Sequence, residues 1–169
     1  MLKLVLADSQ LFEDPELIHF TLLLATDSSL AIERELKTIV HTRKNNLFIF
    51  EPDTEIPDEL EDFKKYISMT LKGDPPHGWD HKKQSLMDFL KNEVGNKIVM
   101  SPKGDKKDPI NVFSRAEDYI VVIGGFKGGD FVSPVYDWAD TAISISDRLL
   151  KTWTVAAEVM VAYRYCSLE

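Results

Sequence analysis

The glycine-rich segment at residues 124–129 constrains the fold more than any other part of this sequence. It holds four of the eight glycines in the chain and reads Gly-Gly-Phe-Lys-Gly-Gly. It directly follows the apolar run 120–123, which is typical of a buried strand. Glycine lets the backbone turn sharply and approach a ligand closely, and α/β proteins bind ligands where parallel strands end. We therefore interpret the segment as one wall of a ligand site, with a plain tight turn as the alternative.

Two familiar nucleotide sites are excluded by the spacing of these glycines. The pattern G-x-G-x-x-G is absent, and no Gly-Lys-Ser/Thr sequence follows. Residues 130–134 end in proline and cannot begin a helix at once, so a pyrophosphate bound at a helix N-terminus is not expected. The segment favours a ligand that is held by backbone groups from several loops.

Strand-like and helix-like runs alternate along the chain. We expect strands at 2–6, 38–43, 47–50, 98–100, 119–123 and 141–145, the second and third joined as a hairpin through residues 44–46. Helices are expected from Pro15 through residue 25 and at 58–72, 83–93 and 151–167, and residues 73–81 are expected to form a loop. This order predicts an α/β fold with a mostly parallel sheet in a single domain, residues 1–169.

Composition limits the class of protein. The single cysteine, Cys166, cannot pair within the chain, which indicates a reduced intracellular protein, and we expect it to be cytoplasmic. No apolar run approaches the roughly 20 residues that a membrane span needs, so no membrane partner is expected. The 28 acidic and 20 basic residues give a net charge of -8, which argues mildly against tight, non-specific binding of nucleic acid.

Several runs in the last third of the chain match one family signature. They are residues 122–131, 143–146 and 149–155, and shorter matches precede them at 17–19, 27–28, 41–42, 52 and 56–57. Together they resemble the pseudouridine-specific small-subunit ribosomal RNA methyltransferases of the SPOUT superfamily, over about residues 14–165. The chain is identified as a divergent member of that family, with a role in ribosome biogenesis.

The resemblance implies a SPOUT-type sheet whose C-terminal part, about residues 97–169, is threaded into a trefoil knot, an exception to the rule that chains avoid knots. Loops at 100–104, 124–129 and 143–154 would hold S-adenosylmethionine. For Leu149, Leu150 and Trp153, ordinary core packing competes evenly with this role. The cofactor-binding residues that the resemblance implies are Met100, Ser101, Gly124, Gly125, Phe126, Gly129, Ile143, Ser144, Ile145, Ser146, Leu149, Leu150, Trp153 and Thr154.

Two carboxylates are the candidate catalytic residues. The family methylates a pseudouridine ring nitrogen, whose proton must leave as the methyl group arrives, and a positioned carboxylate could accept it. The family's Arg-Pro-Asp motif corresponds to Asp14-Pro15-Glu16 here, so Glu16 keeps the carboxylate while the arginine is lost. Asp27 keeps the family's Asp-Ser step. Alternatively, Glu16 only favours the helix N-terminus and Asp27 only accepts hydrogen bonds where that helix ends.

The larger departure from the family pattern concerns RNA binding, because the segment 51–62 holds seven acids and no base. Positions that carry arginine in typical members are Glu55, Asp58 and Asp62, and acids there would repel a phosphate backbone. Other cations must then bind the RNA, and the candidates are Arg34, Arg43 and Lys44, with Lys37, Lys64 and Lys65 behind them. The alternative for any one of them is an ordinary solvated side chain.

The closing helix is apolar around nearly its whole circumference, which predicts cover by a second copy in a homodimer. No metal site is expected, because His77 and His81 are separated by Gly78 and have no evident third ligand. The sequence therefore predicts a homodimeric, S-adenosylmethionine-dependent RNA methyltransferase acting on ribosomal RNA. Two alternatives stay open: a methyltransferase of the same superfamily acting on a different RNA, and a dimeric ribosome-assembly factor with weak or no catalysis.

Overall fold

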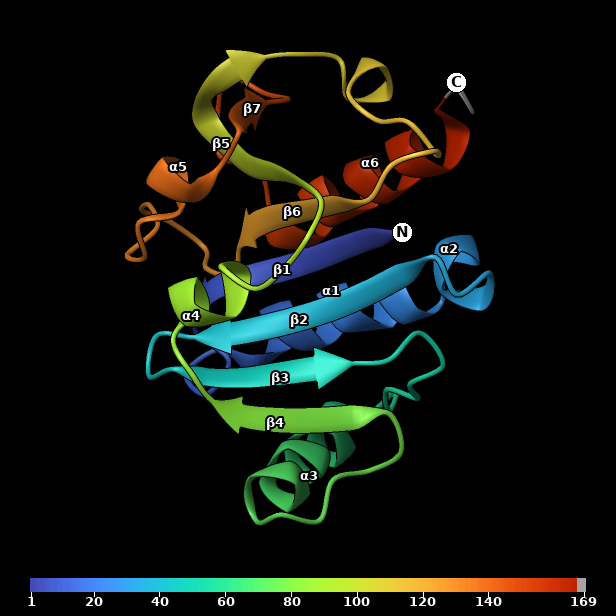
Figure 1. Ribbon diagram of the computed structural model, residues 1–169. Helices are drawn as coiled ribbons and strands as arrows, with labels where there is room; N and C mark the ends of the chain where they lie inside the picture. The colour runs from blue at the N-terminus through green and yellow to red at the C-terminus, as the bar shows by residue number, and fades with distance from the viewer. Residues whose placement is uncertain (167–169) are drawn as a thin grey trace.

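The computed structural model describes residues 1–166, which form a three-layer sandwich of helices around one sheet (Figure 1). The sheet has seven strands in the order β4-β3-β2-β1-β6-β5-β7. The strands are β1 (Leu2–Ser9), β2 (Leu36–Thr42), β3 (Asn46–Phe50), β4 (Trp79–Lys83), β5 (Asn96–Lys106), β6 (Tyr119–Gly124) and β7 (Thr141–Ser144). The helices are α1 (Pro15–Thr26), α2 (Ser29–Ile32), α3 (Leu60–Leu71), α4 (Leu86–Leu90), α5 (Val135–Trp138) and α6 (Thr152–Tyr165), with a 3-10 turn at Pro109–Asn111.

The sheet is mostly parallel, as predicted. Strands β2, β1, β6, β5 and β7 pair in parallel, and β3 is antiparallel to both β2 and β4. The expected hairpin is confirmed, and Asn45 in its turn has the left-handed φ of 59° that asparagine tolerates. The predicted α/β fold class is therefore confirmed, while the trefoil knot stays a prediction.

The two faces of the sheet bury separate apolar cores because β-strand side chains alternate between faces. On one face, Leu4, Leu6 and Val121 pack with the large helices α1, α3 and α6. On the other, Val5 and Val122 pack with the short helices α4 and α5. Central strands β1 and β6 are buried on both sides, which explains why their sequences are continuous apolar runs.

The sheet has two distinct ends. Strands β1, β2, β4 and β6 all finish at the end that lies on the left in Figure 1, and we call this the carboxyl end. The turn between β2 and β3 and the glycine-rich segment lie there. At the opposite end, the amino end, lie the chain N-terminus, α2 and the beginning of the acidic segment that follows β3.

Two segments differ from the sequence-based prediction. Residues 79–83, placed partly in a loop and partly in a helix, form the edge strand β4, and helix α4 is limited to five residues. Trp79 is buried and Asp80 exposed, so the strand alternation exists, but neighbouring prolines and Gly78 masked it. Ser85 then starts α4 by accepting a hydrogen bond from the Asp88 N–H at 3.2 Å.

Strand β5 also differs from the prediction. It continues through residues 101–104, which were expected to form a loop, and its register against β7 shifts between Met100 and Asp105. A Cβ on Gly104 would lie 2.5 Å from the Ala142 carbonyl carbon, so glycine is required where the two strands meet. The predicted helices from Pro15 and at 58–72 are confirmed as α1 and α3, and the closing helix is confirmed through Tyr165; its predicted end at residue 167 lies outside the described residues. Within the described residues, no helix has the length and apolar character that crossing a membrane requires.

Candidate cofactor pocket and acceptor groove

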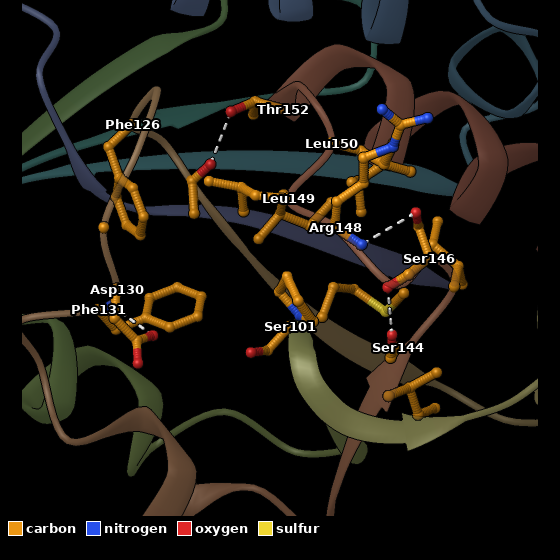
Figure 2. A pocket seen from close by; sticks show the side chains of 18 residues that line it. Ser101, Phe126, Asp130, Phe131, Ser144, Ser146, Arg148, Leu149, Leu150 and Thr152 are labelled. Carbon is orange, nitrogen blue, oxygen red and sulfur yellow. Dashed lines mark hydrogen bonds between the residues drawn. The ribbon is translucent and has the colours of Figure 1, made fainter.

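A cavity of about 550 Å³, including its open mouth, lies where β6 and β7 end, beside the middle of β5. Its lining is mostly apolar with a few placed polar groups, as is typical of small-molecule sites. Figure 2 shows Phe126 and Phe131 on one side of it, with Ser144, Ser146 and Arg148 on the other. The glycine-rich segment, the end of β7 and the start of α6 thus form one cavity, although they are separate in the sequence.

Close packing fixes the glycine-rich wall. A Cβ on Gly124 would lie 2.7 Å from the Phe126 ring, and a Cβ on Gly125 would lie 2.6 Å from the Ser9 Cβ. Gly129 has a φ of +86°, which L side chains rarely adopt. The first two glycines therefore allow Phe126 to fold back over the strand end and line the cavity. This is the backbone cradle that a bound ligand needs, and S-adenosylmethionine fits the site in that respect.

Short hydroxyl contacts hold the opposite wall. The Ser144 hydroxyl donates to the Ser146 carbonyl at 2.7 Å, and the Arg148 N–H donates to the Ser146 hydroxyl at 3.3 Å, as the dashed lines in Figure 2 show. The Thr152 hydroxyl donates to the Gly124 carbonyl at 2.7 Å, which ties the start of α6 to the end of β6. The serines and Thr152 therefore position the loop that carries the apolar residues Leu149 and Leu150.

A hydrogen-bonded clasp joins β5 to the segment after the glycines. Tyr136 donates to the Asp130 carboxylate at 2.7 Å and accepts from the Ser101 hydroxyl at 2.8 Å, and Lys103 pairs with Asp130 at 2.6 Å. Burial acts to raise the pKa of Asp130, but the hydrogen bonds from Lys103 and Tyr136 outweigh it and hold that pKa below its ordinary value. Asp130 is therefore ionised at neutral pH. The clasp links two residues of the cavity wall, Ser101 and Asp130.

Most of the predicted cofactor residues line this cavity. They are Met100, Ser101, Gly124, Phe126, Gly129, Ile143, Ser144, Ile145, Ser146, Leu149 and Leu150. Gly125, Trp153 and Thr154 do not line it: Gly125 packs against Ser9 instead, and Trp153 faces the second cavity described below. Asp130, Phe131 and Val155, which lie within the signature runs but were not named as cofactor residues, also line it. Arg148 lies outside those runs, and an exposed arginine in a loop has no periodic pattern to mark it.

A second, open groove of about 940 Å³ lies beside the cavity, between α1 and the start of α6. Glu16 lines it together with Phe20 and Trp153, whose rings meet edge to face at 5.0 Å. Lys127 pairs with Asp14 at 2.9 Å across its edge, and that hydrogen bond raises the pKa of Lys127. Lys127 and Trp153 of the groove directly follow Phe126 and Thr152 of the cavity in the chain, so the two sites are neighbours.

The remaining predicted site residues are spread over both ends of the sheet. Asp27 caps the far end of α1, roughly 16 Å along the helix from Glu16, and within residues 1–166 it lines neither cavity. Arg34 lies at the amino end, paired with Asp53 at 3.4 Å. Arg43 and Lys44 lie at the carboxyl end, and the Arg43 guanidinium is 5.5 Å from the centre of the Phe126 ring.

One buried group at the carboxyl end was not anticipated. Asp8, almost fully buried and with a φ of 53°, accepts hydrogen bonds from the backbone N–H groups of Val132 and Ser133 at 2.8 Å and from the Ser133 hydroxyl at 2.6 Å. The Asp8 N–H donates to His41 Nδ1 at 3.2 Å. This carboxylate fixes the segment that carries Asp130 and Phe131. Among the described residues, no group of three or more acids, histidines or cysteines could hold a metal ion.

Comparison with known proteins identifies the family. The model of the EMG1/NEP1 methyltransferase family matches residues 8–164. The chain belongs to this family. It is 30% identical over 166 residues to the ribosomal RNA small subunit methyltransferase Nep1 of Methanothrix thermoacetophila, covering 92% of this chain and 71% of that protein. To the protein of the same name from Thermoplasma acidophilum it is 28% identical, covering 88% and 69%.

A solved structure shows the same fold. The crystal structure of Archaeoglobus fulgidus Nep1 bound to S-adenosylhomocysteine superposes with a TM-score of 0.74 at 21% identity, covering 94% of this chain and 79% of that chain. The family that the sequence motifs indicated is therefore confirmed.

Proposed function

We propose that this chain is an S-adenosylmethionine-dependent methyltransferase that acts on small-subunit ribosomal RNA during ribosome biogenesis. The observation that carries the proposal is the cavity formed by three separate segments around the glycine-rich turn. Its EMG1/NEP1 membership and the names of its relatives supply the substrate class. Calorimetric titration with S-adenosylmethionine tests the cofactor, and a folded sample that binds none at millimolar concentration would contradict the proposal.

The finer proposal is that the methyl acceptor is a ring nitrogen of pseudouridine and that the base lies in the open groove. The groove adjoins the cofactor cavity through Lys127, and its rings of Phe20 and Trp153 provide apolar faces for a nucleobase. The cofactor would supply an electrophilic methyl group there. Glu16, on the same groove wall, accepts the proton that leaves the ring nitrogen. Asp27 has no such position and supports the end of α1 instead.

The variant Glu16→Gln tests this assignment. The amide keeps the size of the side chain and cannot take up the proton, so the rate of methyl transfer to a pseudouridine-bearing hairpin should fall about 100-fold or more. Cofactor affinity should stay unchanged. Glu13→Gln is the matched control, because Glu13 is exposed on the same segment and lines neither cavity within residues 1–166. Equal transfer rates for Glu16→Gln and the unchanged protein would favour an assembly factor or a different acceptor.

We further propose that the protein is a homodimer in the cytoplasm, with α6 at the interface. Trp153, Ala157, Val161 and Tyr165 recur every fourth residue of α6 and form an incompletely buried stripe; Val161 is 57% and Tyr165 is 66% exposed. A second copy on this stripe would border the groove at Trp153, which belongs to both. Val161→Glu should yield a monomer in sedimentation analysis. Val94→Glu is the control: it makes the same substitution at a residue that is 81% exposed and lies outside α6, and this variant should remain a dimer.

A further inference from the structure

Four cations without an ion pair gather at one corner of the molecule. Within residues 1–166, Arg43, Lys44, Lys82 and Lys83 are all exposed and none makes a salt bridge. By contrast, the lysines of α3 are paired, as Lys64 is with Glu61. We call the group of Arg43, Lys44, Lys82 and Lys83 the basic edge. It lies at the carboxyl end, on the turn between β2 and β3 and the last residues of β4.

The backbone holds the basic edge in a defined arrangement. Lys83 is paired with Asn46 in the register of β3 and β4, and its ammonium group donates to the Lys44 carbonyl at 2.5 Å. Lys82 is the preceding residue, so it points to the other face of the edge strand. The Asn46 N–H donates to the Thr42 hydroxyl at 3.1 Å, which closes the turn. The charges are therefore presented by a rigid hairpin rather than by a loose loop.

The basic edge is continuous with the cofactor cavity. The Arg43 guanidinium lies 5.5 Å from the centre of the Phe126 ring, and Phe126 lines the cavity. Further along the same end, the pair Lys127–Asp14 borders the groove that contains Glu16. A polyanion lying on the basic edge would thus pass directly beside the site where the methyl group is transferred.

The acidic residues of the segment 51–62 do not all lie near the route that an RNA would take along the basic edge. Glu51 and Asp53 lie at the amino end, where Lys37 binds Glu51 at 3.2 Å and Arg34 binds Asp53 at 3.4 Å. An Arg34 that is already neutralised gains less from a phosphate than a free cation does, because counterion release is the main driving force. Of the three predicted RNA-binding residues, only Arg43 and Lys44 are therefore suited to the task.

We propose that the basic edge binds the phosphate backbone of the substrate RNA and guides it to the groove. This inference rests on the proposed function, since it takes the ligand to be RNA. The partner chemistry is a phosphodiester chain, and an acidic protein is the competing occupant. On this proposal, cations of the β2–β3 hairpin and the edge strand β4 take over the RNA-binding role of the arginines that the family resemblance predicts but that this chain lacks.

The double variant Lys44→Gln, Lys83→Gln tests the proposal, because it leaves the Arg43–Phe126 contact intact. The matched control, Arg34→Asn with Lys37→Gln, removes two cations from the amino end; asparagine tolerates the left-handed φ of 59° at position 34. Binding of a small-subunit ribosomal RNA hairpin is measured by fluorescence anisotropy at several KCl concentrations. Each lost phosphate contact lowers the slope of log affinity against log salt by about 0.7–0.9.

For the basic-edge variant we expect that slope to fall by about 1.4–1.8, with affinity at low salt reduced at least tenfold. The control should keep the slope of the unchanged protein. An unchanged slope in the basic-edge variant would overturn the proposal, as would an equal fall in both variants, which would reflect net charge alone. Wild-type protein that binds the hairpin with a salt slope near zero would likewise overturn it and favour an acidic protein partner.

Calorimetry with S-adenosylmethionine and a methyl-transfer assay on the same samples separate this inference from the proposed function. If cofactor binding and methyl transfer persist while the RNA slopes do not differ, the basic edge is wrong and the enzyme assignment stands. If the slopes differ as expected but no sample binds the cofactor or transfers a methyl group, the basic edge stands and the enzyme assignment is wrong. Thermal unfolding of each variant confirms that the compared samples are folded.

Discussion

The two ends of the sheet carry similar charged residues in different states. At the carboxyl end, neither Arg43 nor Lys44 has an ion pair with any residue of the described part of the chain, and Arg43 lies over Phe126 at the edge of the cavity. At the amino end, cations are paired with acids, as Arg34 is with Asp53 at 3.4 Å. The net charge of -8 is therefore a poor description of either end. Local pairing, rather than the total count, decides which cations can meet a phosphate.

The comparison also explains the acidic segment 51–62. In the sequence it holds seven acids and no base. In the fold it leaves β3 at the amino end, where Glu51 and Asp53 are neutralised, and then passes alongside α1, where Asp58 lines the groove. Only part of the segment is thus near the acceptor groove, and the basic edge lies at the other end of β3.

The largest expected effect on cofactor affinity comes from Gly125→Ala at the carboxyl end. The new Cβ would lie 2.6 Å from the Ser9 Cβ and 3.0 Å from its Cα, so the glycine-rich segment must shift away from β1. Overpacking of this kind costs about 1–3 kcal/mol, and because the shift moves the cavity wall we expect affinity for S-adenosylmethionine to fall roughly tenfold or more. Calorimetric titration measures it.

Gly128→Ala is the control for that prediction. It lies three residues away, has an ordinary φ, and a Cβ there would meet nothing within 4 Å. Its cofactor affinity should stay within about twofold of the unchanged protein. If both alanines weakened binding equally, flexibility of the whole segment would matter rather than the close approach at Gly125, and the rigid-wall description of this end would be incorrect.

A smaller effect is expected from Tyr136→Phe, which removes one oxygen atom from the clasp. The hydrogen bonds to Asp130 and Ser101 are both lost, while the ring still packs on Phe131 at 5.7 Å. With each net hydrogen bond contributing about 0.5–1.5 kcal/mol, the KM for S-adenosylmethionine should rise about three- to tenfold with little change in kcat. Steady-state kinetics at saturating RNA gives both constants.

Tyr66→Phe provides the comparison, because Tyr66 packs edge to face on Trp79, away from the cofactor cavity. It should leave both kinetic constants unchanged. A fall in kcat for Tyr136→Phe at constant KM would show that the clasp affects the transfer step instead of positioning the cavity wall.

Much of the carboxyl end could be predicted from sequence, since its signals are local. The apolar run before the glycines predicts a strand, which β6 confirms. A Cβ at Gly124 or Gly125 would meet Phe126 or Ser9 at less than 3 Å, while the predicted close approach to a ligand stays a prediction. The groups that complete the site could not be predicted this way. Asp8 and Ser133 are 125 positions apart and meet only because β1 and β6 are adjacent in the sheet.

The amino end shows the opposite limitation. The run of acids in 51–62 is obvious in the sequence, but its ion pairs with Arg34 and Lys37 depend on the β2–β3 hairpin. Likewise, β4 was missed because an exposed edge strand with the sequence Trp-Asp-His-Lys-Lys lacks the apolar residues that mark buried strands. Sequence patterns therefore predicted the strands and helices that form the core, but they did not predict the ion pairs of the surface or the exposed edge strand.

A pH-dependent effect of moderate size is expected at the carboxyl end. Burial lowers the pKa of His41 below its ordinary value of 6.5, and its neutral Nδ1 accepts the Asp8 N–H. Below pH 6.5 the unfolded chain binds a proton at His41 that the folded chain does not, so stability from this site is present above pH 6.5 and is lost as the pH falls toward the lowered pKa. The unfolding midpoint should drop by a few °C between pH 7.5 and 5.5.

His41→Gln should reduce the fall of the unfolding midpoint between pH 7.5 and 5.5, although it lowers stability at pH 7.5. His77→Gln is the control, because the His77 side chain is 82% exposed at the amino end, and its profile should follow that of the unchanged protein. Thermal unfolding followed by circular dichroism at five pH values gives the comparison. If the unfolding midpoint of His41→Gln falls as far between pH 7.5 and 5.5 as that of the unchanged protein, other groups cause the fall. The two ends of the sheet would then not differ in this pH dependence.

The smallest effect is expected at the amino end, from Arg34→Asn with Lys37→Gln. Both ion pairs are substantially exposed, and exposed pairs contribute little because solvent screens them and two long side chains must be ordered. The unfolding midpoint should shift by no more than about 2 °C at 0.15 M salt, and the shift should vanish at 1 M salt. A larger shift that persists at high salt would mean that these pairs hold the amino end together. The paired cations of the amino end would then have a structural role that the unpaired cations of the basic edge lack. Phosphate binding alone would no longer explain why Arg43 and Lys44 are left without an ion pair.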